Sequence, residues 1–210
     1  MSPGHIALLG DSILDNAAYT GREPAVVDHL RTLLPAGWRA TLYAVDGSTT
    51  AGIARQVMQV AGDVSHVVLA VGGNDALQQG DLLSRPVRST AEALALFAER
   101  LAAFNRAYRG AIDAALALGR PTTVCTVYNG NLEEPRATLA RVALTTFNDV
   151  ILRIAFEHAL GVIELRSVCA SPEDYANPIE PSGRGGRRIA DAILRAVGIA
   201  GDGRSSRVFV

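Results

Sequence analysis

The stretch HVVLAVGG, residues 66–73, places five consecutive apolar residues directly before two glycines. A strand with one solvated face alternates apolar and polar residues, whereas a continuous apolar run is typical of a strand buried on both faces. The two glycines allow the chain to turn sharply where the run ends. This stretch therefore predicts an inner strand of a parallel sheet that helices cover on both sides.

Four more apolar runs, each closed by a turn signal, predict four more strands: HIALLG (5–10), ATLYAVDG (40–47), TTVCTVYNG (122–130) and GVIELR (161–166). Segments with helical spacing lie between the runs and after the last one, at 24–34, 50–61, about 90–118, about 139–160 and 182–197. Alternating strands and helices imply right-handed crossovers. The sequence thus predicts an α/β fold, a three-layer α/β/α sandwich with a five-stranded parallel sheet.

The longest expected helix, over about 90–118, has an apolar stripe. Its members recur every three or four positions: Leu94, Phe97, Leu101, Phe104 and Tyr108. This spacing puts them on one side of a helix. We expect the whole stripe to face the sheet.

Composition limits the class of protein. A chain of 210 residues with 49% hydrophobic content supports one sizeable core, so we expect a single domain over 1–200. The polar, glycine-rich segment 201–210 predicts a partly ordered tail. Twenty basic and 21 acidic residues give a net charge of -1. No global field therefore attracts nucleic acid or an anionic membrane, and we expect neither as a partner.

The N-terminal residues MSPGHIALLGDS contain no basic region and only a short apolar run, so we expect neither a signal peptide nor a membrane anchor, and a cytoplasmic protein. Cys125 and Cys169 lie in apolar surroundings, which indicates buried free thiols. The sequence has no metal-ligand spacing and no Walker phosphate loop, so we expect no metal and no cofactor.

Distinctive residues follow three of the expected strands. Ser12 follows the first in LLGDS, Gly47 the second in VDGSTT, and Asn74 the third in VGGNDA. Ligands of parallel sheets bind at these carboxyl ends. A hydroxyl, a glycine N–H and a side-chain amide are parts of an acyl-transfer site, because a tetrahedral oxyanion needs fixed donors. Taken singly, Ser12 also fits a helix cap, and Gly47 fits a plain turn.

The motif order, from LLGDSILD through VDGSTT and VGGNDA to IEPSGRGGRRIA, resembles that of the SGNH or GDSL-type serine hydrolases. These are esterases, lipases, thioesterases and deacetylases with a flavodoxin-like sheet, and the resemblance spans nearly the whole domain. It implies that Ser12 is the nucleophile and that the Ser12 N–H, the Gly47 N–H and the Asn74 amide form the oxyanion hole. It also implies that Asp11 braces the turn and that Gly73 lets the chain approach a ligand.

The last motif departs from that family. Its members carry Asp-x-x-His in the block that corresponds to NPIEP here, which places Asn177 at the acid and Glu180 at the histidine. A loop held by Pro178 and Pro181 is expected to aim Glu180 toward Ser12. Without the resemblance, a lone glutamate in a rigid turn is interpreted as solvated.

Three interpretations of Glu180 stay open. In the first, burial raises the pKa of Glu180, which then accepts the Ser12 proton in an esterase that hydrolyses a small carboxylic ester. In the second, a histidine has moved in, although His5 and His66 begin strands at the opposite edge and the other two lie on helices. In the third, a noncatalytic pseudoenzyme binds a small ester or carbohydrate. We favour the first.

Tyr128 and Asn129 close the fourth expected strand in TVYNGN. They either contact the substrate or pack against the domain. The sequence carries no signal for the oligomeric state.

Overall fold

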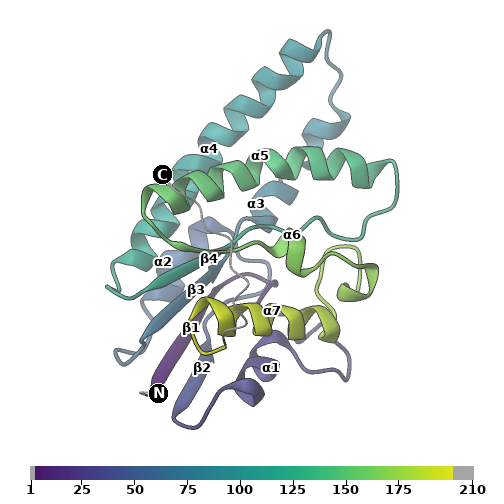
Figure 1. The fold of residues 1–210 in the computed structure, drawn as a ribbon. Helices are drawn as coiled ribbons and strands as arrows, with labels where there is room; N and C mark the ends of the chain where they lie inside the picture. The colour runs from purple at the N-terminus through teal and green to yellow at the C-terminus, as the bar shows by residue number, and fades with distance from the viewer. Residues whose placement is uncertain (1–2, 201–210) are drawn as a thin grey trace.

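One parallel sheet organises the chain (Figure 1). The computed structural model describes residues 3–200, and its strands pair in parallel in the order β2-β1-β3-β4-β5. The strands are β1 (Gly4–Gly10), β2 (Trp38–Leu42), β3 (His66–Ala70), β4 (Thr122–Cys125) and β5 (Gly161–Ile163). The predicted five-stranded parallel sheet is confirmed. The tail predicted over 201–210 lies outside the described residues.

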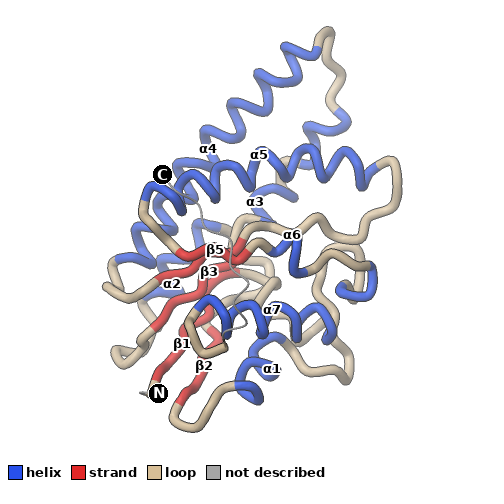
Figure 2. Tube along the Cα trace, viewed as in Figure 1, coloured by secondary structure: helices blue, strands red, loops and turns tan. Residues whose placement is uncertain are grey.

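Helices cover both faces of the sheet, so the predicted three layers are confirmed (Figures 1 and 2). One face carries α1 (Val26–Leu33), α6 (Leu165–Val168) and α7 (Gly183–Ala196). The other carries α2 (Ile53–Val57), α4 (Thr90–Leu116) and α5 (Arg136–Glu157). Shorter elements lie in the loops: α3 (Gly73–Leu77) and the 3-10 helices Thr50–Gly52, Gly80–Ser84 and Pro172–Asp174. The sequence predicted α1, α2, α4, α5 and α7 but neither α3 nor α6.

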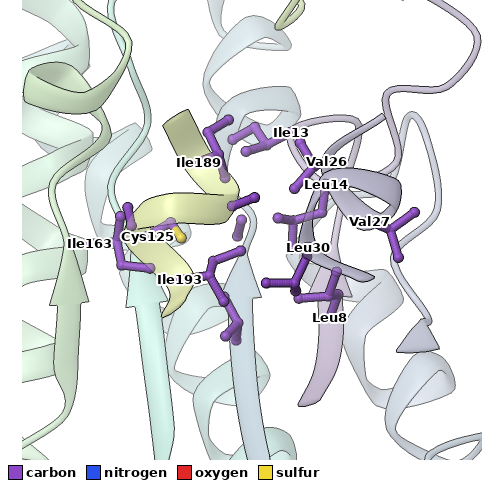
Figure 3. Close-up of a cluster of buried hydrophobic side chains, with 14 of the residues drawn as sticks. Leu8, Ile13, Leu14, Val26, Val27, Leu30, Cys125, Ile163, Ile189 and Ile193 are labelled. Carbon is purple, nitrogen blue, oxygen red and sulfur yellow. The ribbon is translucent and has the colours of Figure 1, made fainter. Parts of the chain in front are cut away.

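Strand β1 shows why its run is apolar throughout. Ile6 and Leu8 point toward α1 and α7, whereas Ala7 and Leu9 point toward the opposite helices, and all four side chains are fully buried. Figure 3 shows the buried cluster on the α1 and α7 side of the sheet, in which Ile193 of α7 lies among the apolar side chains around Leu8. Burying one such aliphatic side chain contributes about 1.5–3 kcal/mol. Both faces of the sheet therefore stabilise the fold.

Two buried amide side chains hold the chain where the strands diverge. Gln56 pairs with both backbone groups of Gly10: its Oε1 accepts from the N–H at 2.8 Å and its Nε2 donates to the carbonyl at 2.8 Å. Asn148 does the same with Val127, at 2.7 and 2.8 Å. Each amide substitutes for a neighbouring strand. The chain can therefore leave the sheet earlier than the sequence predicted. Strand β4 ends at Cys125, whereas the apolar run predicted a strand that continues to residue 130.

The prediction that the apolar stripe of the longest helix faces the sheet is wrong for its first half. Phe104 and Tyr108 are buried, but Leu94 is 64% exposed. A helix of 27 residues is about 40 Å long, whereas a five-residue strand spans about 17 Å. The sheet therefore covers only part of α4, and its N-terminal end projects beyond the other layers (Figure 1).

Cys125 and Cys169 are buried and free, as predicted. Within residues 3–200, no helix combines the length and the apolar character that crossing a membrane requires.

We expect Gln56→Met to lower the free energy of unfolding by about 1–3 kcal/mol, because methionine keeps the volume but leaves the buried Gly10 N–H without an acceptor. The Gly10 carbonyl loses the bond from Gln56 but keeps the one from the Val45 N–H. Urea denaturation measures the change. Gln59→Met, at an exposed position on the next turn of chain, is the control and should lie within about 0.5 kcal/mol of wild type. Equal stabilities for the two variants would contradict this account of the strand end.

Candidate active site

A cavity of about 540 Å³ lies at the carboxyl ends of the strands. Apart from Gly47, every site residue that the sequence predicted lines it: Asp11, Ser12, Gly73, Asn74, Tyr128, Asn177 and Glu180. These residues come from the loops after β1, β3 and β4 and from the loop before α7. The topology thus brings both ends of the chain to one cavity.

The turn after β1 presents Ser12 to this cavity. Gly10 has φ +141°, and a Cβ there would lie 1.8 Å from the Ala70 carbonyl oxygen, so only glycine fits. Asp11 then closes a tight turn, because its Oδ1 accepts from the Ile13 N–H at 3.0 Å. The Ser12 hydroxyl caps no helix. It donates to Glu180 Oε1 at 3.0 Å, across 168 residues of chain.

Asn177 shapes the loop that carries Glu180. Its side-chain oxygen accepts from the backbone N–H groups of Ile179 and Glu180, both at 2.9 Å. This is an Asx-type turn, in which the side chain replaces a backbone acceptor. Asn177 therefore fixes the backbone of the loop and not the carboxylate of Glu180.

Two side chains from other elements hold the same loop. The Tyr128 hydroxyl donates to the Ile179 carbonyl at 2.7 Å. Asn16 Nδ2 donates to the Pro181 carbonyl at 3.1 Å, while its Oδ1 accepts from the Val26 N–H at 2.9 Å. Tyr128 is thus a buried brace of the loop. Asn16 was missed by sequence reasoning, since nothing in its local pattern indicates a partner 165 positions away.

The turn after β2 is fastened to the start of α3. Asn74 Nδ2 donates to the Ser48 carbonyl at 2.9 Å, and Asp75 accepts from the Thr50 N–H at 3.0 Å and from its hydroxyl at 2.6 Å. An amide has a second hydrogen, so Asn74 keeps one for a ligand. Gly47 lies in this turn at φ +75°, exposed and outside the cavity lining.

Several backbone N–H groups near the site have no acceptor within residues 3–200, among them those of Gly73 and Asn74 at the start of α3. The N–H groups of Ser12 and Gly47 are two more of these. Both belong to turns that the bonds described above hold in place. Backbone donors fixed in this way can stabilise a developing negative charge without reorganisation.

Asp11 and Glu180 are buried carboxyls, with 1% and 6% of their surface exposed. Burial and, to a smaller extent, the charge of Glu180 raise the pKa of Asp11 to about 7, although the hydrogen bond from the Ile13 N–H lowers it. Burial likewise raises the pKa of Glu180 to about 7, although the hydrogen bond from the Ser12 hydroxyl lowers it. Asp11 Oδ2 and Glu180 Oε2 have no hydrogen-bond partner within the described chain.

The raised pKa makes Glu180 a stronger base than an exposed glutamate. A glutamate carboxylate with its ordinary pKa of 4.5 is a weak base at neutral pH. A pKa of about 7 matches the working pH, which is the best condition for taking up a proton and returning it. Glu180 thus combines a pKa near neutral pH with a direct hydrogen bond to the Ser12 hydroxyl. None of the four histidines lines the cavity, and no group of three potential metal-ligating side chains occurs in residues 3–200.

Comparison with known proteins agrees with this geometry. A sequence model of the GDSL-like lipase/acylhydrolase family matches residues 8–188. No curated protein sequence matches the chain.

Solved structures share the fold at low identity. An extracellular lipase from Streptomyces rimosus superposes with a TM-score of 0.70 and 16% identity, over 92% of this chain and 99% of that chain. The acetylxylan esterase Axe2 from Geobacillus stearothermophilus gives 0.68 and 20%, over 94% and 95%. A phospholipase A1 from Streptomyces albidoflavus NA297 gives 0.68 and 17%, over 93% and 100%.

We expect Glu180→Gln to become more stable relative to wild type as the pH rises. The carboxyl has a pKa of about 7 in the folded state and 4.5 as its ordinary value. Between these values the folded protein keeps a proton that the unfolded chain has lost, so wild-type stability falls with rising pH. From pH 5 to pH 8 this effect amounts to about 2 kcal/mol.

Urea denaturation of both proteins at pH 5 and pH 8 measures this difference. Glu99→Gln, at an exposed position on α4, is the control and should follow wild type at both pH values. A Glu180→Gln difference that is the same at pH 5 and pH 8 would show that the folded carboxyl is not perturbed.

Proposed function

Because this chain belongs to the GDSL-like lipase/acylhydrolase family, we propose that it hydrolyses a small carboxylic ester through an acyl-enzyme, with Ser12 as nucleophile and Glu180 as base. One observation carries the proposal. The Ser12 hydroxyl donates to the Glu180 carboxylate at 3.0 Å inside the cavity. This is the contact that a nucleophile needs with its base.

In the first half of the reaction, Ser12 Oγ attacks the ester carbonyl carbon while its proton moves to Glu180 Oε1. The carbonyl oxygen becomes an oxyanion. When the tetrahedral intermediate collapses, the bond to the alcohol oxygen breaks and Glu180 gives its proton to that oxygen. The alcohol leaves, and the acyl group stays on Ser12 as an ester.

In the second half, the Glu180 carboxylate takes a proton from water, whose oxygen attacks the acyl carbon. The second tetrahedral intermediate releases Ser12 Oγ, which recovers its proton from Glu180. The carboxylic acid leaves. No cofactor enters either step, and the protonation state of Glu180 is restored.

Three donors are assigned to the oxyanion: the Ser12 N–H, the second amide hydrogen of Asn74 and the Gly47 N–H. The first and third have no acceptor within residues 3–200 and are therefore free to donate, a property that they share with the Gly73 and Asn74 N–H groups at the start of α3. Asp11 braces the turn under Ser12, and Gly73 keeps that side of the cavity open. In the reacting state Asp11 keeps its proton, because a charge there would face the Glu180 carboxylate.

One observation favours a second candidate function. Gly47 lies outside the cavity lining, and Asn74 already donates to Ser48, so the oxyanion hole is less complete than the nucleophile and base. A noncatalytic relative that binds a small ester or carbohydrate in the same cavity has no need of that hole.

Hydrolysis of p-nitrophenyl acetate separates the two. We expect wild-type turnover that falls at least 100-fold in both Ser12→Ala and Glu180→Gln. Because only the ionised Glu180 accepts a proton, kcat/KM should rise with pH through a midpoint of about 7. Ser167→Ala and Glu99→Gln, at exposed positions on α6 and α4, are the matched controls and should retain the wild-type rate.

Each alternative result has a distinct meaning. Absence of wild-type turnover, together with saturable binding of an ester or sugar, supports the noncatalytic candidate. Full activity in Ser12→Ala rules out the assigned nucleophile, and full activity in Glu180→Gln rules out the assigned base.

We expect the double variant Asn177→Asp/Glu180→His to hydrolyse the same ester at least threefold faster than wild type at pH 8. An aspartate at 177 can still accept the two backbone bonds of the turn. A neutral imidazole becomes a cation when it takes the serine proton and then stabilises the oxyanion, which a carboxyl cannot do. An inert but folded double variant would mean that the loop does not aim position 180 at Ser12.

A further inference from the structure

The cavity extends well beyond Ser12 and Glu180, and this extension is apolar. Most of the remaining lining is aliphatic or aromatic: Ala76, Leu77, Leu83, Phe97, Leu132, Ala140, Ala143, Leu144 and Phe147. Two polar side chains, Gln79 and Arg136, also line this part of the cavity. We call this part the apolar lobe. It belongs to the same cavity as the Ser12 hydroxyl.

The walls of the apolar lobe are the parts of the helices that the sheet does not cover. Phe97 comes from the projecting half of α4, Ala143 and Leu144 from the first half of α5, and Leu83 from the 3-10 helix Gly80–Ser84. Figure 1 shows these ends of α4 and α5 beyond the strands. Packing on the core below the sheet accounts for Leu144 and Phe147, but Leu77, Leu83 and Phe97 belong to neither core cluster.

Exposure of the same side chains supports a ligand. Leu77 is 51% exposed and Leu83 is 38% exposed although both line the cavity. Large apolar side chains left open around a concave site are typical of a surface that an apolar ligand covers.

The size of the cavity distinguishes among acyl groups. An acetyl group has three heavy atoms, on the order of 100 Å³ if each takes the ~30 Å³ of a water molecule. The cavity holds about 540 Å³, several times that volume. It falls in the range of sites that enclose ligands of drug size.

We propose that the apolar lobe binds an uncharged linear acyl chain of about eight carbons or more, so that the preferred substrates are medium-chain acyl esters. The proposal rests on the proposed function for the position of the ester group, at Ser12. The ionised carboxylate of Glu180 repels a free carboxylate at that end of the cavity, so the chain enters as a neutral ester.

Ala140 and Ala143 are small side chains in the wall of the apolar lobe. They lie three residues apart on α5, so they share one side of the helix, and both are half-buried in the cavity wall. Their small side chains leave the room that Leu144 and Phe147 enclose. A larger side chain at Ala143 would occupy the space assigned to the chain.

Binding of amides tests the lobe without any catalytic step. Octanamide and butanamide are neutral acyl analogues, and isothermal titration calorimetry on the wild-type protein measures both. We expect the Kd of octanamide to be at least tenfold lower, since each buried methylene is worth about fourfold in affinity. Equal affinities, or no binding of octanamide, would overturn the proposal.

A variant pair locates the chain. Ala143→Phe should weaken octanamide at least tenfold and butanamide less than threefold, whereas Thr145→Phe should change neither, because Thr145 is exposed and does not line the cavity. Unchanged octanamide binding in Ala143→Phe, or an equal loss of both amides in the folded variant, would overturn the assignment. If Ala143→Phe does not fold, the wild-type comparison alone decides.

The two proposals fail separately. Inactive wild-type protein that still prefers octanamide would remove the esterase and keep the lobe. An active esterase whose kcat/KM is the same for p-nitrophenyl octanoate and butyrate, with equal amide affinities, would remove the lobe and keep the esterase.

Discussion

The hydrogen bond from Ser12 to Glu180 is the interaction on which the rest of the site depends. It joins turns that lie 168 residues apart, and it exists only because parallel topology brings both to the carboxyl edge of one sheet. Burying a carboxylate there is unfavourable, and the raised pKa of Glu180 expresses that cost. In the proposed reaction, the same cost makes Glu180 a base of useful strength at neutral pH. Burial of Glu180 thus lowers the stability of the folded protein when the carboxyl is ionised, and it raises the pKa that the proposed proton transfer requires.

Neutral amides provide the rigidity that this pair needs. Gln56 and Asn148 pair bidentately with backbone at strand ends, while Asn16 connects the Glu180 loop to the start of α1. An amide satisfies both a donor and an acceptor without adding charge. This matters beside Asp11 and Glu180, because a further charge would shift their protonation. The loops can therefore depart from the sheet while their buried backbone groups stay bonded.

Sequence patterns that are local predicted the fold well. The apolar runs located all five strands, and the motif order located Ser12, Asn74 and Glu180 at one cavity. Features set by distant partners escaped prediction: a sequence does not show that Gln56 bonds to Gly10 or that Tyr128 braces a loop 51 residues away. Periodicity also does not reveal where a sheet ends, so the projecting half of α4 was expected in the core. That half of the helix forms a wall of the cavity instead.

The rate at which Ser12 reacts with p-nitrophenyl ethyl methylphosphonate tests the Ser12–Glu180 pair most directly, because phosphonylation needs the nucleophile and its base but no later step. Mass spectrometry of the digested protein identifies the modified residue. The account predicts a single adduct on Ser12 that forms about tenfold faster at pH 8 than at pH 6, as expected for a base with a pKa of about 7. No adduct, an adduct on another side chain, or equal rates at the two pH values would contradict it.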